Sequence, residues 1–121
     1  MGEWLREYYD DVDNMRLDEF VNRHTDDVVV KFANSPAAIG KEEVAHAIGG
    51  FWQMIGGLRH DFVNVYNDGD STILEADIDY ERKDGSHVTV PSTSVLHRRG
   101  PLVDQLRIYL DLAPVFAPTA T

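Results

Sequence analysis

The stretch that decides the fold is STILEADIDYERKDGSHVTVPSTSVLHR, residues 71–98. In both halves apolar residues alternate with polar ones and β-branched side chains are common, a pattern typical of half-buried strands. Asp84-Gly85 lies between the halves, and such a pair between two strand-like runs is a hairpin signal. The sequence therefore predicts two antiparallel strands joined near Asp84-Gly85, with one face turned toward a core.

The same pattern continues on both sides of this hairpin. Strand-like runs occupy residues 59–67 and 102–110, with turn signals at Asp68-Gly69 and Arg99-Gly100. We therefore expect a four-stranded antiparallel meander after residue 59. A further β-branched strand is expected at residues 25–32.

The N-terminal part of the chain has helical spacing instead. Apolar residues recur every three or four positions over residues 4–15, a short helix follows Asp18, and a third helix begins near Lys41. Helices that cover one face of a curved antiparallel sheet give an α+β fold with a cone-shaped pocket. We expect one domain over residues 1–121, with a loosely held tail after about residue 112.

The turns also predict which side chains face the pocket. If both later turns contain two residues, Tyr80 pairs with Thr89 and Thr93 pairs with Leu106. The inner face then carries Leu74, Ala76, Ile78, Tyr80, Thr93, Val95, Leu106, Ile108 and Leu110. On the outer face, Asp77, Ser92 and Arg107 would form one cross-strand row, which we interpret as a solvated or dimer-facing ladder.

The first strand of the meander leaves two alternatives open. A two-residue turn at Asp68-Gly69 sends Asp61 inward, whereas a turn one residue longer or shorter sends His60 inward. Either residue would place an ionisable group against an apolar wall, where pKa values shift and proton transfer can be arranged.

The composition excludes several classes of function. The chain has a net charge of −10 and no cysteine. An acidic surface repels nucleic acid and anionic membranes, and thiol chemistry and disulfides are excluded. The histidines lack the spacing of a metal site. Because no apolar run could span a bilayer or act as a leader, we expect a cytoplasmic protein.

The order of the motifs resembles the nuclear transport factor 2-like superfamily, and within it the SnoaL-like branch, named for polyketide cyclases. The motifs are YYDDVDNMRLDEF, HTDDVVVKF, AAIGKEEVAHAI, LRHDFVNVYNDGD, RKDGSHVTVP and LVDQLRIYLDLAP. The resemblance extends from about residue 5 to residue 114. It implies a small, rather apolar molecule in the cone, no metal or organic cofactor, and a homodimer formed through the sheet.

Individual enzymes of the superfamily map onto this chain in part. Resemblance to the ketosteroid isomerases implies an oxyanion-hole tyrosine at Tyr8 and places their general base at Phe32, whose ring cannot transfer a proton. The base of the limonene epoxide hydrolases falls at Ile108. Resemblance to the scytalone dehydratases places a catalytic histidine at His60 and an aspartate near Asp13.

Three interpretations follow. The first is a cofactor-free isomerase, cyclase or dehydratase in which Tyr8 stabilises an oxyanion and His60 or Asp61 acts as base, with Asp13 a further catalytic candidate. Its substrate-binding wall would comprise Trp4, Phe32, Trp52, Ile78, Thr93, Leu106 and Ile108. The second is a non-catalytic module that holds a ligand or a partner in the same cone. The third is a structural dimer with a filled core.

Overall fold

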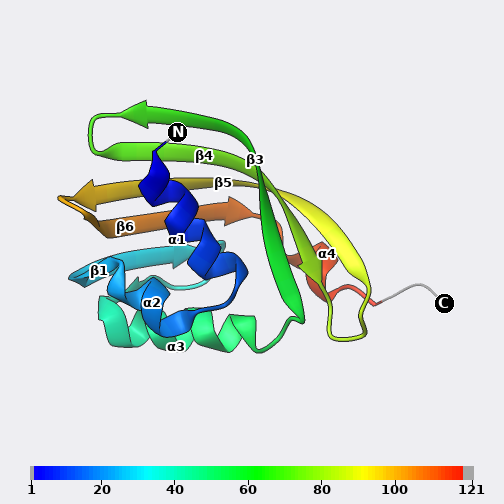
Figure 1. Cartoon of the computed structure of the whole chain (residues 1–121). Coiled ribbons are helices and arrows are strands. Elements are labelled where there is room, and N and C mark those ends of the chain that lie inside the picture. The colour runs from blue at the N-terminus through cyan, green and yellow to red at the C-terminus, as the bar shows by residue number, and fades with distance from the viewer. Residues whose placement is uncertain (1, 119–121) are drawn as a thin grey trace.

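Helices α1, α2 and α3 pack against one face of a curved six-stranded sheet in this computed structural model, which describes residues 2–118 (Figure 1). The strand order is β2-β1-β6-β5-β4-β3. The predicted α+β fold with N-terminal helices on a curved sheet is thereby confirmed. The elements are α1 (Glu3–Asp13), α2 (Leu17–Asn22), β1 (His24–Phe32), β2 (Ala38–Ile39), α3 (Gly40–Trp52), β3 (Gly57–Asp68), β4 (Ser71–Glu81), β5 (His87–Arg99), β6 (Leu102–Leu110) and α4 (Ala113–Phe116).

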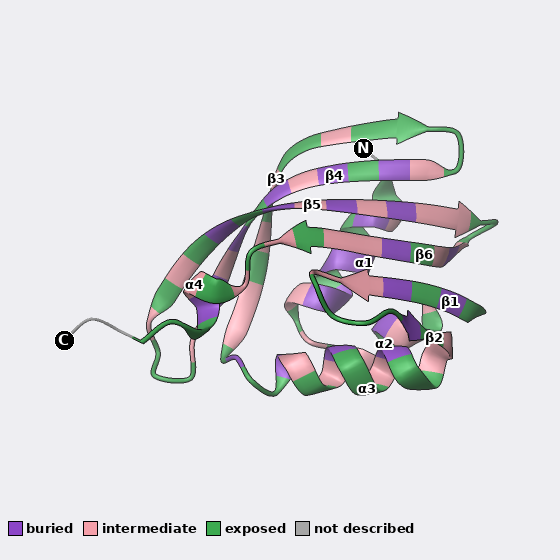
Figure 2. Ribbon diagram, turned by 180° about the vertical axis from the view of Figure 1, so that it is seen from behind, coloured by how far each residue is buried: buried purple, intermediate pink, exposed green. Residues whose placement is uncertain are grey.

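Strand β6 lies in the middle of the sheet, between β1 and β5. It pairs antiparallel with β5 and parallel with β1, so that Val30 lies beside Leu106. The predicted meander is therefore the antiparallel half of a mixed sheet. Figure 2 shows buried and exposed residues alternating along β4 and β5, as expected when one face of a sheet carries the core.

Between β4 and β5, Arg82 and Ser86 face each other, so the loop that they close, residues 83–85, is one residue longer than the two-residue turn expected. Gly85 has a φ of 88°, and the Arg82 N–H donates to the Ser86 carbonyl at 2.7 Å. Because glycine accepts this left-handed conformation without a steric penalty, a three-residue loop closes the hairpin. Tyr80 consequently pairs with Val88 instead of Thr89.

This one-residue shift turns the side chains of β5 to the opposite faces from those predicted. Ser92 and Ser94 are buried on the concave face, whereas Thr93 and Val95 lie on the outer face. The expected row of Asp77, Ser92 and Arg107 does not form, because Asp77 pairs with Pro91 and Ser92 faces inward.

Strand β6 nevertheless presents the predicted face to the core. The turn is Gly100-Pro101 and an irregularity follows in the ladder, so Leu106 pairs with Leu96 instead of Thr93. The pairing of β6 with β5 is thus shifted by three residues, and that of β5 with β4 by one residue. A shift by an odd number of residues reverses which side chains of a strand face the core. Two reversals in succession restore the predicted orientation of β6, so Leu106 and Ile108 face inward.

The pairing of β3 with β4 decides between His60 and Asp61. His60 pairs with Ile78 on the concave face, and Asp61 projects from the outer face. The turn is Gly69-Asp70, since Asp68 pairs with Ser71. An extra residue in β3 at Val63 then shifts the ladder, which is a β-bulge.

The segment after residue 112 contacts the domain. Val115 in α4 is buried, Phe116 lies against Phe51, and Arg82 donates to the Pro114 carbonyl. These contacts place α4 against Phe51 of α3 and against the loop that follows β4. No helix within the described range is long and apolar enough to cross a membrane.

Candidate functional site

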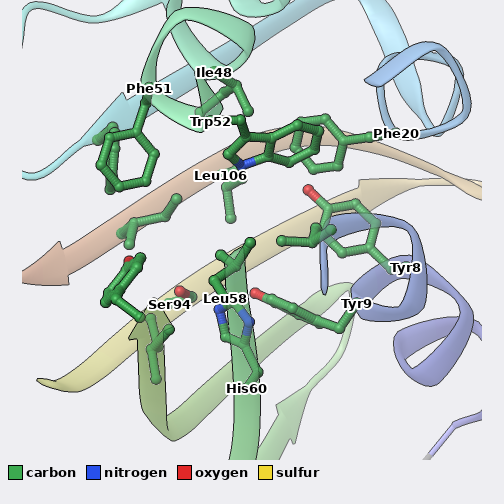
Figure 3. Close-up of a pocket in the computed structure, with 15 residues that line it drawn as sticks. Tyr8, Tyr9, Phe20, Ile48, Phe51, Trp52, Leu58, His60, Ser94 and Leu106 are labelled. Atoms are coloured by element: carbon green, nitrogen blue, oxygen red, sulfur yellow. The ribbon is translucent and has the colours of Figure 1, made fainter. Parts of the chain in front are cut away.

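A mostly apolar cavity lies between the helices and the concave face of the sheet (Figure 3). About 50 Å³ is open to the centres of water-sized molecules. By the same measure one water needs about 10–15 Å³, so the space suits a few waters or a small organic molecule. The lining consists of Tyr8, Tyr9, Val12, Phe20, Phe32, Ile48, Phe51, Trp52, Leu58, His60, Ile78, Tyr80, Ser94, Leu106 and Ile108. Such a space argues against the filled-core interpretation.

Most of the predicted wall lines this cavity, with two exceptions. Phe32, Trp52, Ile78, Leu106 and Ile108 all face it. Trp4 lies outside, because its ring packs beneath the Arg98 guanidinium, 4.1 Å from the ring centroid. Thr93 lies on the outer face, since the longer β4–β5 loop reverses the orientation of β5.

The candidate catalytic residues also separate into two groups. Tyr8 and His60 line the cavity, with Asp13 directly beside His60. Asp61 is directed away from it, with a 65% exposed side chain 3.4 Å from Arg59. Of the two alternatives, His60 is therefore the one that faces the cavity, because the register of β3 turns Asp61 toward solvent.

Asp13 and His60 form a hydrogen-bonded pair beside the cavity. Asp13, the last residue of α1, places Oδ1 2.6 Å from His60 Nδ1, and its Oδ2 accepts the His60 backbone N–H at 3.0 Å. The two side chains are only 21% and 8% exposed. A carboxylate can only accept at this contact, so it favours the imidazole tautomer with its proton on Nδ1, in which the Nε2 lone pair can accept a proton.

Two further polar residues of the site were not identified from the sequence. The Tyr9 ring lies 4.6 Å from His60, and its hydroxyl points toward His60 and Ser94 (Figure 3). Burial raises the pKa of Tyr9, the Ser94 hydroxyl lowers it in part, and the Asp13 charge raises it further. Tyr9 therefore remains a hydrogen-bond donor across the physiological pH range.

A sequence signal for Tyr9 was present. Tyr9 and Asp13 are four residues apart in α1, a spacing that places two side chains on one helix face. Ser94 carried no such signal, because the predicted register placed it on the outer face.

Tyr8 is engaged in a different hydrogen-bonded chain. Its hydroxyl donates to His24 Nε2 at 2.7 Å, and His24 Nδ1–H donates to the Phe20 carbonyl at 2.8 Å. Burial lowers the pKa of His24 to about 4, so the imidazole is neutral, and burial raises the pKa of Tyr8. The single Tyr8 proton is thus already donated, which disfavours the expected oxyanion role. Within residues 2–118 no three side chains are grouped to hold a metal ion.

Solved structures with the same architecture come from several bacteria. A hypothetical protein with a ketosteroid isomerase-like fold from Catenulispora acidiphila DSM 44928, solved with trimethylamine, matches with a TM-score of 0.86 and 18% identity, covering 97% of this chain and 92% of its own. A candidate SnoaL-like polyketide cyclase from Jannaschia sp. CCS1 matches with a TM-score of 0.81 and 18% identity, with coverages of 97% and 92%. An LEH-like epoxide hydrolase from M. tuberculosis matches with a TM-score of 0.77 and 15% identity, with coverages of 93% and 84%.

At these identities the structural matches show the fold alone. No curated protein sequence matches the chain significantly. The sequence model of one family, described as the SnoaL-like domain, matches residues 5–104, which is most of the chain. The protein is therefore a member of the SnoaL-like domain family.

Proposed function

We propose that this protein is a cofactor-independent isomerase, cyclase or dehydratase that moves a proton on a small, largely apolar molecule. The observation that carries the proposal is the Asp13–His60 pair, 2.6 Å apart at the wall of a mostly apolar cavity. An imidazole oriented by a carboxylate is a common general base, and general acid–base catalysis contributes about 10²–10⁴-fold to a rate.

In this proposal His60 Nε2 removes a proton from a carbon next to a carbonyl group. The electron pair moves onto the carbonyl oxygen, and the Tyr9 hydroxyl donates a hydrogen bond to the oxyanion that forms. Asp13 stabilises the imidazolium through Nδ1. His60 then returns the proton to another carbon or to a departing hydroxyl group, which gives isomerisation or loss of water without a cofactor.

A non-catalytic binding module is the second candidate. It is supported by Phe32 and Ile108, which line the cavity at positions where related enzymes are expected to carry a base. In that case the Asp13–His60 pair would only hold the end of α1 against β3. The two candidates differ in one measurable property, because a binding module leaves its ligand unchanged at every pH.

The outer face of the sheet supports a further proposal, a homodimer formed through the sheet; the cytoplasmic location is proposed from the sequence alone. Large apolar side chains are exposed there, with Val63 57%, Tyr66 52% and Tyr109 54% accessible. Burial of such a patch favours association. Sedimentation at micromolar concentration should give a dimer, and Tyr109→Glu should give monomer; a monomeric parent protein would contradict this proposal.

The proposed activity can be tested without knowing the natural substrate. Cyclohexanone in D₂O exchanges its α-protons slowly, and proton NMR follows this exchange. We expect the protein to accelerate it and His60→Gln to remove at least about nine-tenths of the acceleration. Asp61→Asn is the matched control, because its side chain lies on the outer face. Equal acceleration by the parent protein and His60→Gln would overturn the assignment of the base.

A further inference from the structure

The indole of Trp52 presents a donor to the cavity that no group of the protein satisfies. Trp52 is 7% exposed, and the edge of its ring that carries Nε1 faces the cavity (Figure 3). Within residues 2–118, the only fully enclosed side-chain nitrogen or oxygen atoms without a partner are Nε of Arg82 and Nε of Arg98. Trp52 Nε1 differs from them because it borders open space, and none of the described groups accepts its hydrogen bond.

An indole N–H can only donate, so Trp52 requires an acceptor from whatever fills the cavity. Buried tryptophan N–H groups usually find a partner, since leaving a donor unsatisfied is costly. The Tyr80 hydroxyl is in a similar position, because the residue is 1% exposed, lines the cavity and has no hydrogen-bond partner in the described part of the chain. Trp52 on α3 and Tyr80 on β4 therefore both call for an oxygen acceptor in the cavity.

The side of the cavity opposite Trp52 also presents a hydrogen-bond donor that needs an acceptor. Tyr9 and His60 extend from α1 and β3 toward the side of the cavity formed by Trp52 (Figure 3). The Tyr9 hydroxyl can donate to a ligand there, and its ring lies 4.6 Å from that of His60. A ligand with one oxygen could satisfy Trp52 or Tyr9, but one with two separated oxygens could satisfy both.

From this arrangement we infer that Trp52 is a specificity-determining residue, whose N–H anchors a second oxygen acceptor of the ligand. The ligand class is a small dicarbonyl or hydroxycarbonyl compound, with one oxygen at Tyr9 and His60 and the other at Trp52. The inference rests on the proposed function, since it assumes that the reacting carbonyl lies at His60. An alkylammonium ion would also suit aromatic walls, but it would face the positive end of the Trp52 N–H dipole.

The chain contains two tryptophans, which makes the test direct. Trp4 lies outside the cavity beneath Arg98, so its indole signal in a ¹H–¹⁵N spectrum serves as an internal control. The probes are 1,4-cyclohexanedione and cyclohexanone, which differ in the second oxygen. We expect the dione to bind about three- to tenfold more tightly, the gain of one neutral hydrogen bond, and to shift only the Trp52 indole proton downfield.

Trp52→Phe keeps an aromatic ring and removes only the N–H donor and part of the ring volume. In this variant the two ketones should bind with affinities within about twofold of each other. Trp4→Phe, the matched control, should keep the preference for the dione.

Equal affinities in the parent protein, a preference that survives in Trp52→Phe, or tighter binding of tetramethylammonium would overturn the inference. A lack of binding by every probe would overturn it as well. Because the proposed function is read from α-proton exchange at His60, exchange without a dione preference rejects the role of Trp52 alone. A dione preference without exchange rejects the catalysis alone.

Discussion

Asp13 and His60 are 47 residues apart in the chain, yet one carboxylate accepts both the imidazole Nδ1–H and the backbone N–H of His60. The last residue of α1 thus fixes the position of β3 and the tautomer of the histidine in one contact. Structure and proposed chemistry depend on the same carboxylate, and the variants below separate the two.

Asp13→Asn should impair both properties. An amide has one acceptor oxygen, so it cannot accept from the imidazole and the backbone of His60 at full strength. We expect a loss of about 1–3 kcal/mol in the free energy of unfolding and about 10–100-fold slower α-proton exchange. Urea unfolding and NMR exchange measure these effects. Asp61→Asn should change stability by less than about 0.5 kcal/mol, and unchanged exchange in Asp13→Asn would contradict a role in orienting His60.

Tyr8→Phe and Tyr9→Phe should have opposite consequences, although the two residues are adjacent. Tyr8→Phe leaves the buried His24 Nε2 without its donor, so it should cost about 1–3 kcal/mol of stability and change exchange little. Tyr9→Phe should slow exchange about 100-fold or more, because it removes the proposed oxyanion donor. Urea unfolding and NMR exchange measure both variants. Slow exchange in Tyr8→Phe together with normal exchange in Tyr9→Phe would instead assign the oxyanion role to Tyr8.

Acid should destabilise the fold through His24. Its pKa is lowered from 6.5 to about 4 in the folded protein, so between these pH values the unfolded chain binds the proton first. The free energy of unfolding should therefore decrease as the pH falls from about 6.5 to 4, by roughly 3 kcal/mol from this residue. Urea unfolding across this range measures the decrease. His24→Gln should be less stable at pH 7 but lose less on acidification, and parallel curves for the two proteins would refute the assignment.

Two glycine substitutions should shift stability in opposite directions. Gly85 has a φ of 88°, and an alanine there should cost about 1 kcal/mol. Gly50 lies within α3, and a methyl group added there would contact nothing within 4 Å. Gly50→Ala should therefore stabilise the protein by roughly 0.5–1 kcal/mol. Thermal unfolding compares the two variants. A Gly85→Ala variant as stable as the parent protein would contradict the left-handed conformation of Gly85 in the three-residue loop.

Element types could be predicted from the sequence because they depend on local periodicity. The alternation in residues 71–98 and the helical spacing near the N-terminus each reflect a single buried face. Register could not be predicted as well, since it depends on whether a loop contains two or three residues. That difference decided whether Ser94 or Thr93 faces the cavity.

For the candidate site, the sequence identified individual residues but not the contacts between them. His60 and Asp13 were identified as separate candidates, but their pairing depends on the packing of α1 against β3 and left no local signal. The bulge at Val63 and the turn at Gly69-Asp70 decided between His60 and Asp61. Tyr8 was placed correctly in the cavity, but its hydrogen bond to the buried His24 could be seen only in three dimensions.

The central position of β6 has a consequence for biosynthesis. As the chain leaves the ribosome, β1 and helices α1, α2 and α3 are made well before residues 102–110, which supply the one long strand beside β1 within residues 2–118. Until then Val30 lacks its partner Leu106, and β1 presents an open edge to other nascent chains. Completion of the sheet around β1 therefore waits for residues 102–110, and chaperone binding during translation should concentrate on the segment that contains β1.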